Sequence, residues 1–441
     1  MTLSIHPSST QGGAEQGENW LKRHQWPALF FGLIVATGMG YSFLWNPIFY
    51  HSPNWLTPPD LWRTYRAAQY VIWGGEGQIY NNPAAFQTFP GIAIVLSPIA
   101  KLAGMWHLSE GFPVALARPS AWWLLDPVQL SLGALLLFPL DAIARRLAVP
   151  SRRRIPLLAL EAALIWPSVV FWGHPEDALG LTFALYGVIA VADRRWLRFA
   201  GFFALATVMQ PLVLLILPIC LAYVPLTRWP QAATVIVLPT FVTLIAPLVQ
   251  EWSATSKLLL RQPNYFANNH PTPWAAIAPV IAPPRTEKLK VLNYVGSPHG
   301  HHHVVMIDMK VHSMPVVAAG PGRIVAIVIA CALGFAIKRI TPTWPQLLWA
   351  VALALLLRCI FEPVMVPYYL LPGLALVLLT ASQLNTLRFC VVAATVAMCT
   401  LLSYRHVSEW QYYVTMVTTI GVALVAAWPG RRDPRFEPSS T

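Results

Sequence analysis

The sequence predicts an all-α polytopic membrane protein with about twelve transmembrane helices, and three observations support this fold class. The chain of 441 residues is 56% hydrophobic and only 11% charged, whereas soluble domains carry about 25% charged residues. Many of its 19 tryptophans fall near the ends of apolar stretches, as in interfacial aromatic belts. Lys and Arg clusters flank those stretches, so the net charge of +12 reflects membrane topology and indicates no nucleic-acid partner.

Apolar stretches long enough to cross a membrane recur along the chain. A hydrocarbon core about 30 Å thick requires about 20 apolar helical residues. Clear spans are predicted at 26–46, 121–144, 156–173, 232–249, 320–337, 345–362, 368–384, 389–404 and 412–428. Another is predicted at 177–192. The run 199–226 is interrupted by Gln210-Pro211, and proline breaks the helical hydrogen-bond ladder, so two short helices are predicted there.

The apolar segment 89–105 is predicted not to cross. If it crossed, the basic cluster between 145 and 154 would lie on the outer side, against the positive-inside rule. We therefore expect a helix that lies on or dips into the outer leaflet. This choice gives twelve spans in a plasma membrane with both termini in the cytoplasm.

The chain is predicted to form one transmembrane domain over residues 20–428. Residues 1–19 are expected to be a disordered cytoplasmic N-terminus, and 429–441 a cytoplasmic tail. Two outer loops, 47–120 and 250–319, are unusually long, and loops of that length are uncommon unless they have a function.

The first outer loop carries an amphipathic helix with a candidate catalytic acid. Two prolines followed by Asp60 are a helix-start signal. Arg63 and Thr64 lie three and four residues beyond Asp60, so the carboxylate, the cation and the hydroxyl are expected on one helical face. The simpler alternative is that Asp60 only complements the helix dipole.

Three motifs follow the predicted first span in the outer loop. In chain order they read Asp60-Leu61, Gly77-Gln78-Ile79-Tyr80 and Phe89-Pro90-Gly91. They resemble the GT-C superfamily of glycosyltransferases, and most closely glycosyltransferase family 87, the actinobacterial polyprenyl-phosphate-mannose mannosyltransferases. The resemblance covers roughly residues 26–220 and implies a GT-C-like bundle with surface helices in its first outer loop. The sequence departs from the family pattern at Thr64 and at Gln210, where a lysine is common.

By this resemblance the chain would transfer a sugar, mannose, from a polyprenyl-phosphate-sugar donor to a glycolipid or glycan acceptor. The partners would be these lipids, and the active site would face the outer side of the plasma membrane. Asp60 inherits the role of general base, and burial at the membrane is expected to raise its pKa toward a useful value. No cofactor is expected to be required, although a divalent cation remains possible in this superfamily.

A polar turn between two spans supplies the second group of candidates. His174, Glu176 and Asp177 are predicted to contact the acceptor sugar or a divalent cation, since hard cations prefer carboxylate oxygens. The alternative is that the two acids satisfy free N–H groups at the start of the next helix.

Arginines near the outer side are candidates for binding the donor phosphate: Arg63, Arg118 and Arg358. A guanidinium can bind a phosphate with two parallel hydrogen bonds. For Arg358 the alternative is a structural ion pair with Glu362, four residues later on the same helical face. Tyr369 follows closely and is a candidate sugar contact.

The second long outer loop is predicted to be a lid over the acceptor. Asn269 and His270 are candidate sugar contacts because hydroxyl groups need side-chain donors and acceptors. The histidine run at 299–303 lacks a spacing typical of zinc sites, and it is expected to be a solvated loop with no metal site.

Other functions remain open at this stage. A transporter or flippase would predict internal repeats and paired broken helices, and no clear half-to-half similarity is present. An enzyme of the same fold with another donor, such as polyprenyl-phosphate-arabinose, is equally compatible with the sequence. So is an inactive relative, since fold does not imply function.

Overall fold

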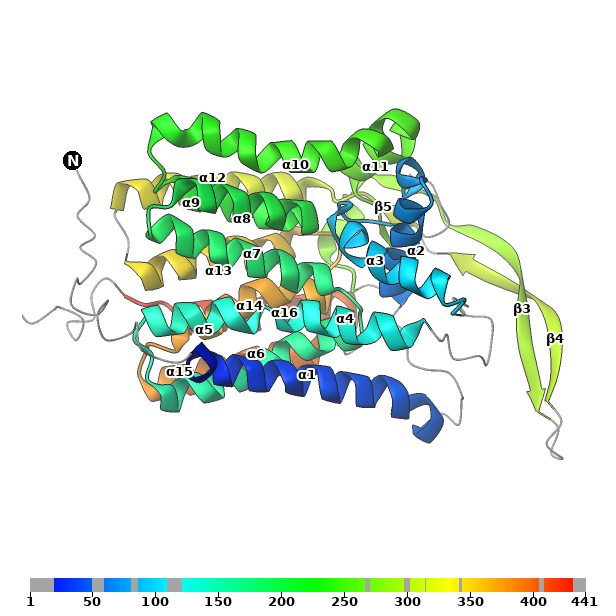
Figure 1. Ribbon diagram of the computed structural model, residues 1–441, viewed down its shortest axis with the longest axis horizontal. Helices are drawn as coiled ribbons and strands as arrows, with labels where there is room; N and C mark the ends of the chain where they lie inside the picture. Colours follow the sequence, from blue (N-terminus) through cyan, green and yellow to red (C-terminus); the bar gives the residue numbers. More distant parts are fainter. Residues whose placement is uncertain are drawn as a thin grey trace, which may run out of the picture.

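The computed structural model describes residues 20–49, 59–80, 86–108, 121–265, 270–296, 302–313, 315–340, 343–403 and 408–430. Helices whose long axes run largely side by side make up most of it (Figure 1). The α-helices are α1 (Trp20–Phe49), α2 (Pro59–Ile72), α3 (Gly91–Met105), α4 (Trp122–Ala134), α5 (Leu137–Arg146), α6 (Ser151–Val170), α7 (Pro175–Ala192), α8 (Trp196–Met209), α9 (Leu217–Leu221), α10 (Trp229–Gln250), α11 (Trp252–Arg261), α12 (Pro321–Ile340), α13 (Trp344–Phe361), α14 (Pro367–Ala381), α15 (Thr386–Leu402) and α16 (Glu409–Ala426).

Five helical segments among the described residues are long and apolar enough to cross a membrane. They are Lys22–Leu44, Trp122–Arg146, Pro175–Ala192, Leu226–Gln250 and Trp344–Phe361. Four shorter apolar helices accompany them. The predicted class of helical membrane protein is therefore confirmed.

The predicted span 121–144 consists of two helices, α4 and α5, with a break near Leu135. The physical reason is Pro139 in the first turn of α5, because proline has no N–H to donate to the carbonyl four residues earlier. The two helices nevertheless continue in one direction across the bundle (Figure 1).

Helices α2 and α3 lie at one end of the bundle, which we call the loop end (Figure 1). Residues Ile92, Ala93 and Leu96 of α3 are buried in a small apolar core that also includes Leu61 and Tyr65 of α2. This packing agrees with the expectation that the apolar segment 89–105 does not cross the bundle. The opposite end contains the turns from α5 to α6 and from α7 to α8.

The predicted break at Gln210 is confirmed. Helix α8 ends at Met209, Gln210 is extended, and a short 3-10 helix covers Pro211–Leu215 before α9. A Cβ at Gly180 of α7 would lie 2.7 Å from the Cβ of Gln210, so the glycine permits close contact between the two helices. Gln210 is thereby held against the first turns of α7.

Part of the second outer loop forms strands, which the all-α prediction did not include. Strands β3 (Arg285–Gly296) and β4 (His302–Ser313) pair in an antiparallel hairpin that projects from the loop end (Figure 1). A small sheet joins β1 (Asn264–Tyr265), β5 (Val316–Val317) and β2 (Val280–Ala282) in that order. Polar and apolar residues alternate in β3 from Lys288 to Val291, which is the period of a strand.

Candidate functional site

Asp60 lies in the first turn of α2 and is engaged on both carboxylate oxygens. Arg63 Nη1 donates to Asp60 Oδ1 over 2.9 Å, as the spacing of three residues predicts. The hydroxyl of Thr64 donates to the backbone carbonyl of Asp60 over 3.2 Å. Arg63 and Thr64 therefore both contact Asp60 on one helical face, as predicted, but only Arg63 bonds its carboxylate.

The second partner of Asp60 is His174, 114 residues later in the chain. His174 Nε2 lies 3.1 Å from Asp60 Oδ2, and His174 Nδ1 lies 2.7 Å from Glu176 Oε1. The turn that presents His174 starts at Gly173, whose φ of +67° is in the left-handed region that glycine adopts without strain. One imidazole ring thus bridges two carboxylates from separate elements.

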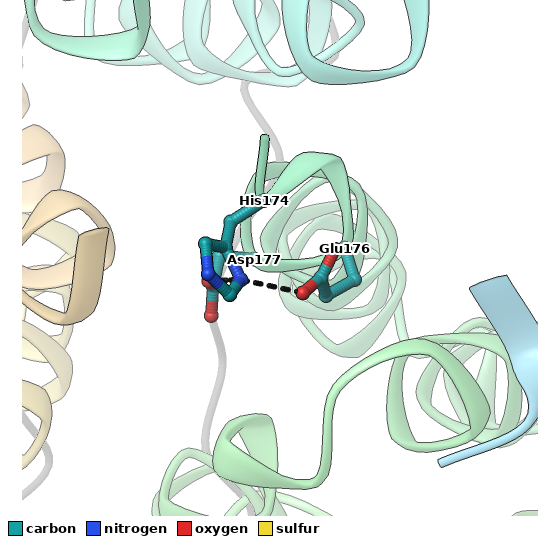
Figure 2. Close-up of side chains that lie close together, drawn as sticks. All are labelled: His174, Glu176 and Asp177. Carbon is teal, nitrogen blue, oxygen red and sulfur yellow. Dashed lines mark hydrogen bonds and ion pairs between the residues drawn. The ribbon is translucent and has the colours of Figure 1, made fainter. Parts of the chain in front are cut away.

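Figure 2 shows the turn that joins His174, Glu176 and Asp177. Gln210 Nε2 donates to Asp177 Oδ1 over 2.6 Å, and Asp177 Oδ2 lies 3.8 Å from His174 Nδ1. The side-chain bonds of both acids therefore go to other side chains, and the N-cap residue His174 makes no capping bond either. Helix capping does not account for this cluster.

Two buried carboxylate oxygens of this turn are left over. Glu176 Oε2 and Asp177 Oδ2 find no hydrogen-bond partner in the part of the chain that the structure describes. Burying a polar atom without a partner costs free energy, so natural proteins rarely retain such atoms without a reason. Unused acceptors inside a polar cluster are typical of a site that binds a ligand.

The predicted direction of the Asp60 pKa is wrong. Burial raises the pKa of Asp60, but the hydrogen bond with His174 and the charges of His174 and Arg63 outweigh burial and bring it below its ordinary value of 3.8. Burial alone would lower the pKa of His174, but Glu176 and Asp60 raise it well above 6.5 through their charges and hydrogen bonds. Both pKa shifts favour an ionised Asp60 carboxylate paired with a protonated His174.

The same turn has the donor atoms for a metal ion. His174, Glu176 and Asp177 each offer one ligand atom, and these atoms lie within 4.8 Å of one another. A metal ligand must be a neutral imidazole, whereas the carboxylates hold His174 in its protonated form. Loss of that proton would accompany any cation that binds here.

Aromatic rings from the start of α14 connect His174 to the predicted phosphate-binding arginine. Tyr368 stacks on the imidazole of His174, with ring centroids 3.7 Å apart and an interplanar angle of 16°. The ring of Tyr369 lies 4.8 Å from that of Tyr368. The Arg358 guanidinium carbon lies 4.1 Å from the Tyr369 centroid, which is within the range of a cation–π contact.

Arg358 forms the structural ion pair that was its alternative interpretation. Arg358 Nε lies 3.3 Å from Glu362 Oε1, and both side chains are almost fully buried. Asp177 also contributes to the electrostatic environment of Arg358. The guanidinium therefore already has a carboxylate partner, which limits its capacity to neutralise a phosphate.

The second outer loop contacts the segment between α13 and α14 through a side chain and through its backbone. The Thr272 hydroxyl donates to the Glu362 carbonyl over 2.5 Å, and the Met365 N–H donates to the His270 carbonyl over 2.8 Å. The His270 ring stacks on Tyr412 with centroids 4.2 Å apart. The structure thus places the His270 ring against α16. Asn269 and Arg118 lie outside the described residues.

Two residues of this site were not among the predicted site residues. Gln210 was noted as a helix break and as a departure from the family pattern, and its position beside a proline was the available signal. Tyr369 was predicted but its neighbour Tyr368 was not, because no sequence pattern indicates that the Tyr368 ring would lie against His174. No known protein family matches the chain, and neither does any curated protein or solved structure.

Proposed function

We propose that the chain is a membrane glycosyltransferase. It transfers a hexose, mannose, from a polyprenyl-phosphate-sugar donor to a glycolipid or glycan acceptor at the outer face of a plasma membrane. The observation that carries the proposal is the contact between Asp60 of α2 and His174 before α7, at the loop end of a bundle of apolar helices (Figure 1). An acid on the first loop and an acidic turn at the same end are the two parts that the family resemblance implies.

Asp60 acts as the general base in this proposal. The acceptor oxygen forms a bond to the anomeric carbon, the bond from that carbon to the phosphate oxygen breaks, and its electron pair leaves with the lipid phosphate. The acceptor hydroxyl loses its proton to Asp60. A carboxylate with a lowered pKa suits a late proton transfer, because the hydroxyl becomes acidic only as its oxygen bonds to the anomeric carbon.

His174 orients this base. Its imidazolium bonds Asp60 Oδ2 while Arg63 bonds Oδ1, so the carboxylate is fixed in one plane. Glu176 holds the other ring nitrogen, which secures the ring in turn. In this proposal Glu176 and Asp177 accept hydrogen bonds from sugar hydroxyls through the oxygens that accept none from the described residues.

The test is transfer of radiolabelled mannose from polyprenyl-phosphate-mannose by purified wild-type protein and by Asp60→Asn. The variant keeps the shape of the side chain and removes its basicity, so we expect turnover to fall by about 10²- to 10⁴-fold while donor binding is retained. Glu76→Gln is the matched control, since Glu76 lies in the same loop and no contact of its side chain is described. Full activity in Asp60→Asn would contradict the mechanism.

Twelve spans and an outward-facing loop end are part of the same proposal. They are tested by cysteine labelling in a background without Cys331 and Cys390, which are exposed. A cysteine at position 110 should react with an impermeant thiol reagent from outside, and one at position 150 should not. The reverse pattern would place the loop end in the cytoplasm.

A further inference from the structure

The start of α12 lies directly against the end of α13, next to the ion pair of Arg358 and Glu362. A Cβ on Gly322 would overlap the backbone carbonyl of Phe361, so only glycine permits this approach. The following residue, Arg323, is thereby brought within electrostatic range of Glu362, Arg358 and Tyr369. Two guanidinium groups therefore lie beside one carboxylate.

The two arginines differ in how their charges are satisfied. Arg358 is 3% exposed, pairs with Glu362 and lies over the Tyr369 ring. Arg323 is only partly buried and makes no hydrogen bond or ion pair with any residue that the structure describes. Its charge is thus available at the surface of the cluster.

A partly buried cation without a fixed partner normally faces a cavity or a ligand in a membrane protein. Glu362 already pairs with Arg358. A ligand that pairs with the positive charge of Arg323 must therefore be another anion. A guanidinium binds a phosphate group with two parallel hydrogen bonds, and a phosphate at membrane level is carried by a lipid. We infer that Arg323 is the phosphate-binding residue of this site and takes the phosphate of a lipid-linked donor.

This inference rests on the proposed function and specifies how the donor is oriented in the site. A short series of contacts joins the base to the cation cluster: Asp60 to His174, His174 to Tyr368, Tyr368 to Tyr369, and Tyr369 to Arg358. A donor with its phosphate on Arg323 therefore presents its sugar toward the tyrosines and Asp60. Positive charge is then close to the oxygen that becomes negative as the bond breaks.

The experiment measures binding of a short-chain polyprenyl phosphate, which carries no sugar, to the full-length protein in detergent. Arg323→Gln should weaken binding by about tenfold or more, as expected for loss of a charge-assisted bidentate contact. Arg323→Lys should retain part of the affinity, because the charge remains without the planar fork. Arg261→Gln is the control, because this substitution removes the same charge from an exposed residue at the end of α11. The backbone carbonyl of Arg261 accepts a hydrogen bond from the N–H of Ala319, shortly before α12.

Wild-type affinity in Arg323→Gln, or an equal loss in Arg261→Gln, would overturn the assignment. The assignment would also be overturned if inorganic phosphate or phosphatidylglycerol displaced the probe at the same concentrations as unlabelled polyprenyl phosphate. The site would then not distinguish a polyprenyl carrier from other phosphates. The thermal unfolding midpoint of each variant verifies that it is folded.

The two proposals fail separately. If wild-type protein binds polyprenyl phosphate through Arg323 but transfers no sugar, the transferase proposal is wrong and the phosphate site stands. If transfer depends on Asp60 but Arg323→Gln leaves the donor KM unchanged, the phosphate site is wrong and the transferase proposal stands.

Discussion

The two ends of the bundle use charged residues in different ways. At the opposite end, Asp141 pairs with Arg145 over 3.2 Å and with Arg154 over 3.0 Å. Arg146 and Asp193 form a bidentate pair at 2.7 and 2.9 Å. At the loop end, carboxylates instead gather around the single ring of His174. Asp177 Oδ2 and Asp141 Oδ2 both lack a hydrogen bond among the described residues, but Asp141 Oδ2 lies 3.2 Å from the Arg145 guanidinium, whereas the ion-pair contact of Asp177 Oδ2 is with His174 at 3.8 Å.

The difference separates structural charges from charges available for binding. Buried ions that satisfy one another fix the packing of helices, and removing one partner leaves the other buried and unpaired. A cluster with leftover acceptors and shifted pKa values is typical of a functional site. Variants at the opposite end should therefore change stability, and variants at the loop end should change activity.

The largest stability effect is expected for Asp141→Asn. The substitution leaves Arg145 and Arg154 without their carboxylate, which should destabilise the protein by about 3 kcal/mol. The loss is measured from the thermal unfolding midpoint in detergent. Transfer activity per folded molecule should stay at the wild-type level, in contrast to Asp60→Asn. A selective loss of activity with an unchanged midpoint would break the comparison between the two ends.

An intermediate effect is expected for His174→Gln. Without the imidazolium, Asp60 loses one of the groups that hold its pKa below 3.8, and burial then raises that pKa. The acid limb of the activity profile should move to higher pH, and turnover should fall by about tenfold or more because the base is no longer oriented. An acid limb at the wild-type position would show that His174 does not control Asp60.

The same pair sets a pH window for stability. The lowered pKa of Asp60 contributes stability above its unfolded pKa, and this stability is lost as pH falls through the folded value. The raised pKa of His174 contributes stability that is fully present below about 6.5 and is lost as pH rises through the folded value. The thermal unfolding midpoint of the wild-type protein should therefore exceed that of His174→Gln most clearly between about pH 4 and 6.5.

The smallest effect is expected for Arg146→Gln. Its pair with Asp193 is partly exposed, with side-chain exposures of 40% and 30%, and exposed pairs contribute about 0.2–1 kcal/mol. The unfolding midpoint should shift slightly and the shift should shrink at high salt. A shift in midpoint as large as that of Asp141→Asn would show that burial does not determine how much each ion pair at this end contributes to stability.

The sequence by itself determined the local features of this protein. The lengths of the apolar stretches identified helices able to span a membrane, and Gln210-Pro211 predicted the break after α8. Helical spacing predicted the pairs Asp60 with Arg63 and Arg358 with Glu362, because residues three or four apart lie on one face whatever surrounds them. These features follow from helix geometry and from the missing N–H of proline.

Only the tertiary structure decided which distant groups meet. Asp60 reaches His174 across 114 residues, Gln210 reaches Asp177 across 33, and Gly322 brings Arg323 to the end of α13. The pKa of Asp60 followed from these contacts, since burial alone would have shifted it the other way. Packing selects one arrangement among many that satisfy the same helical periods, and the charges in a site depend on neighbours that periodicity does not specify.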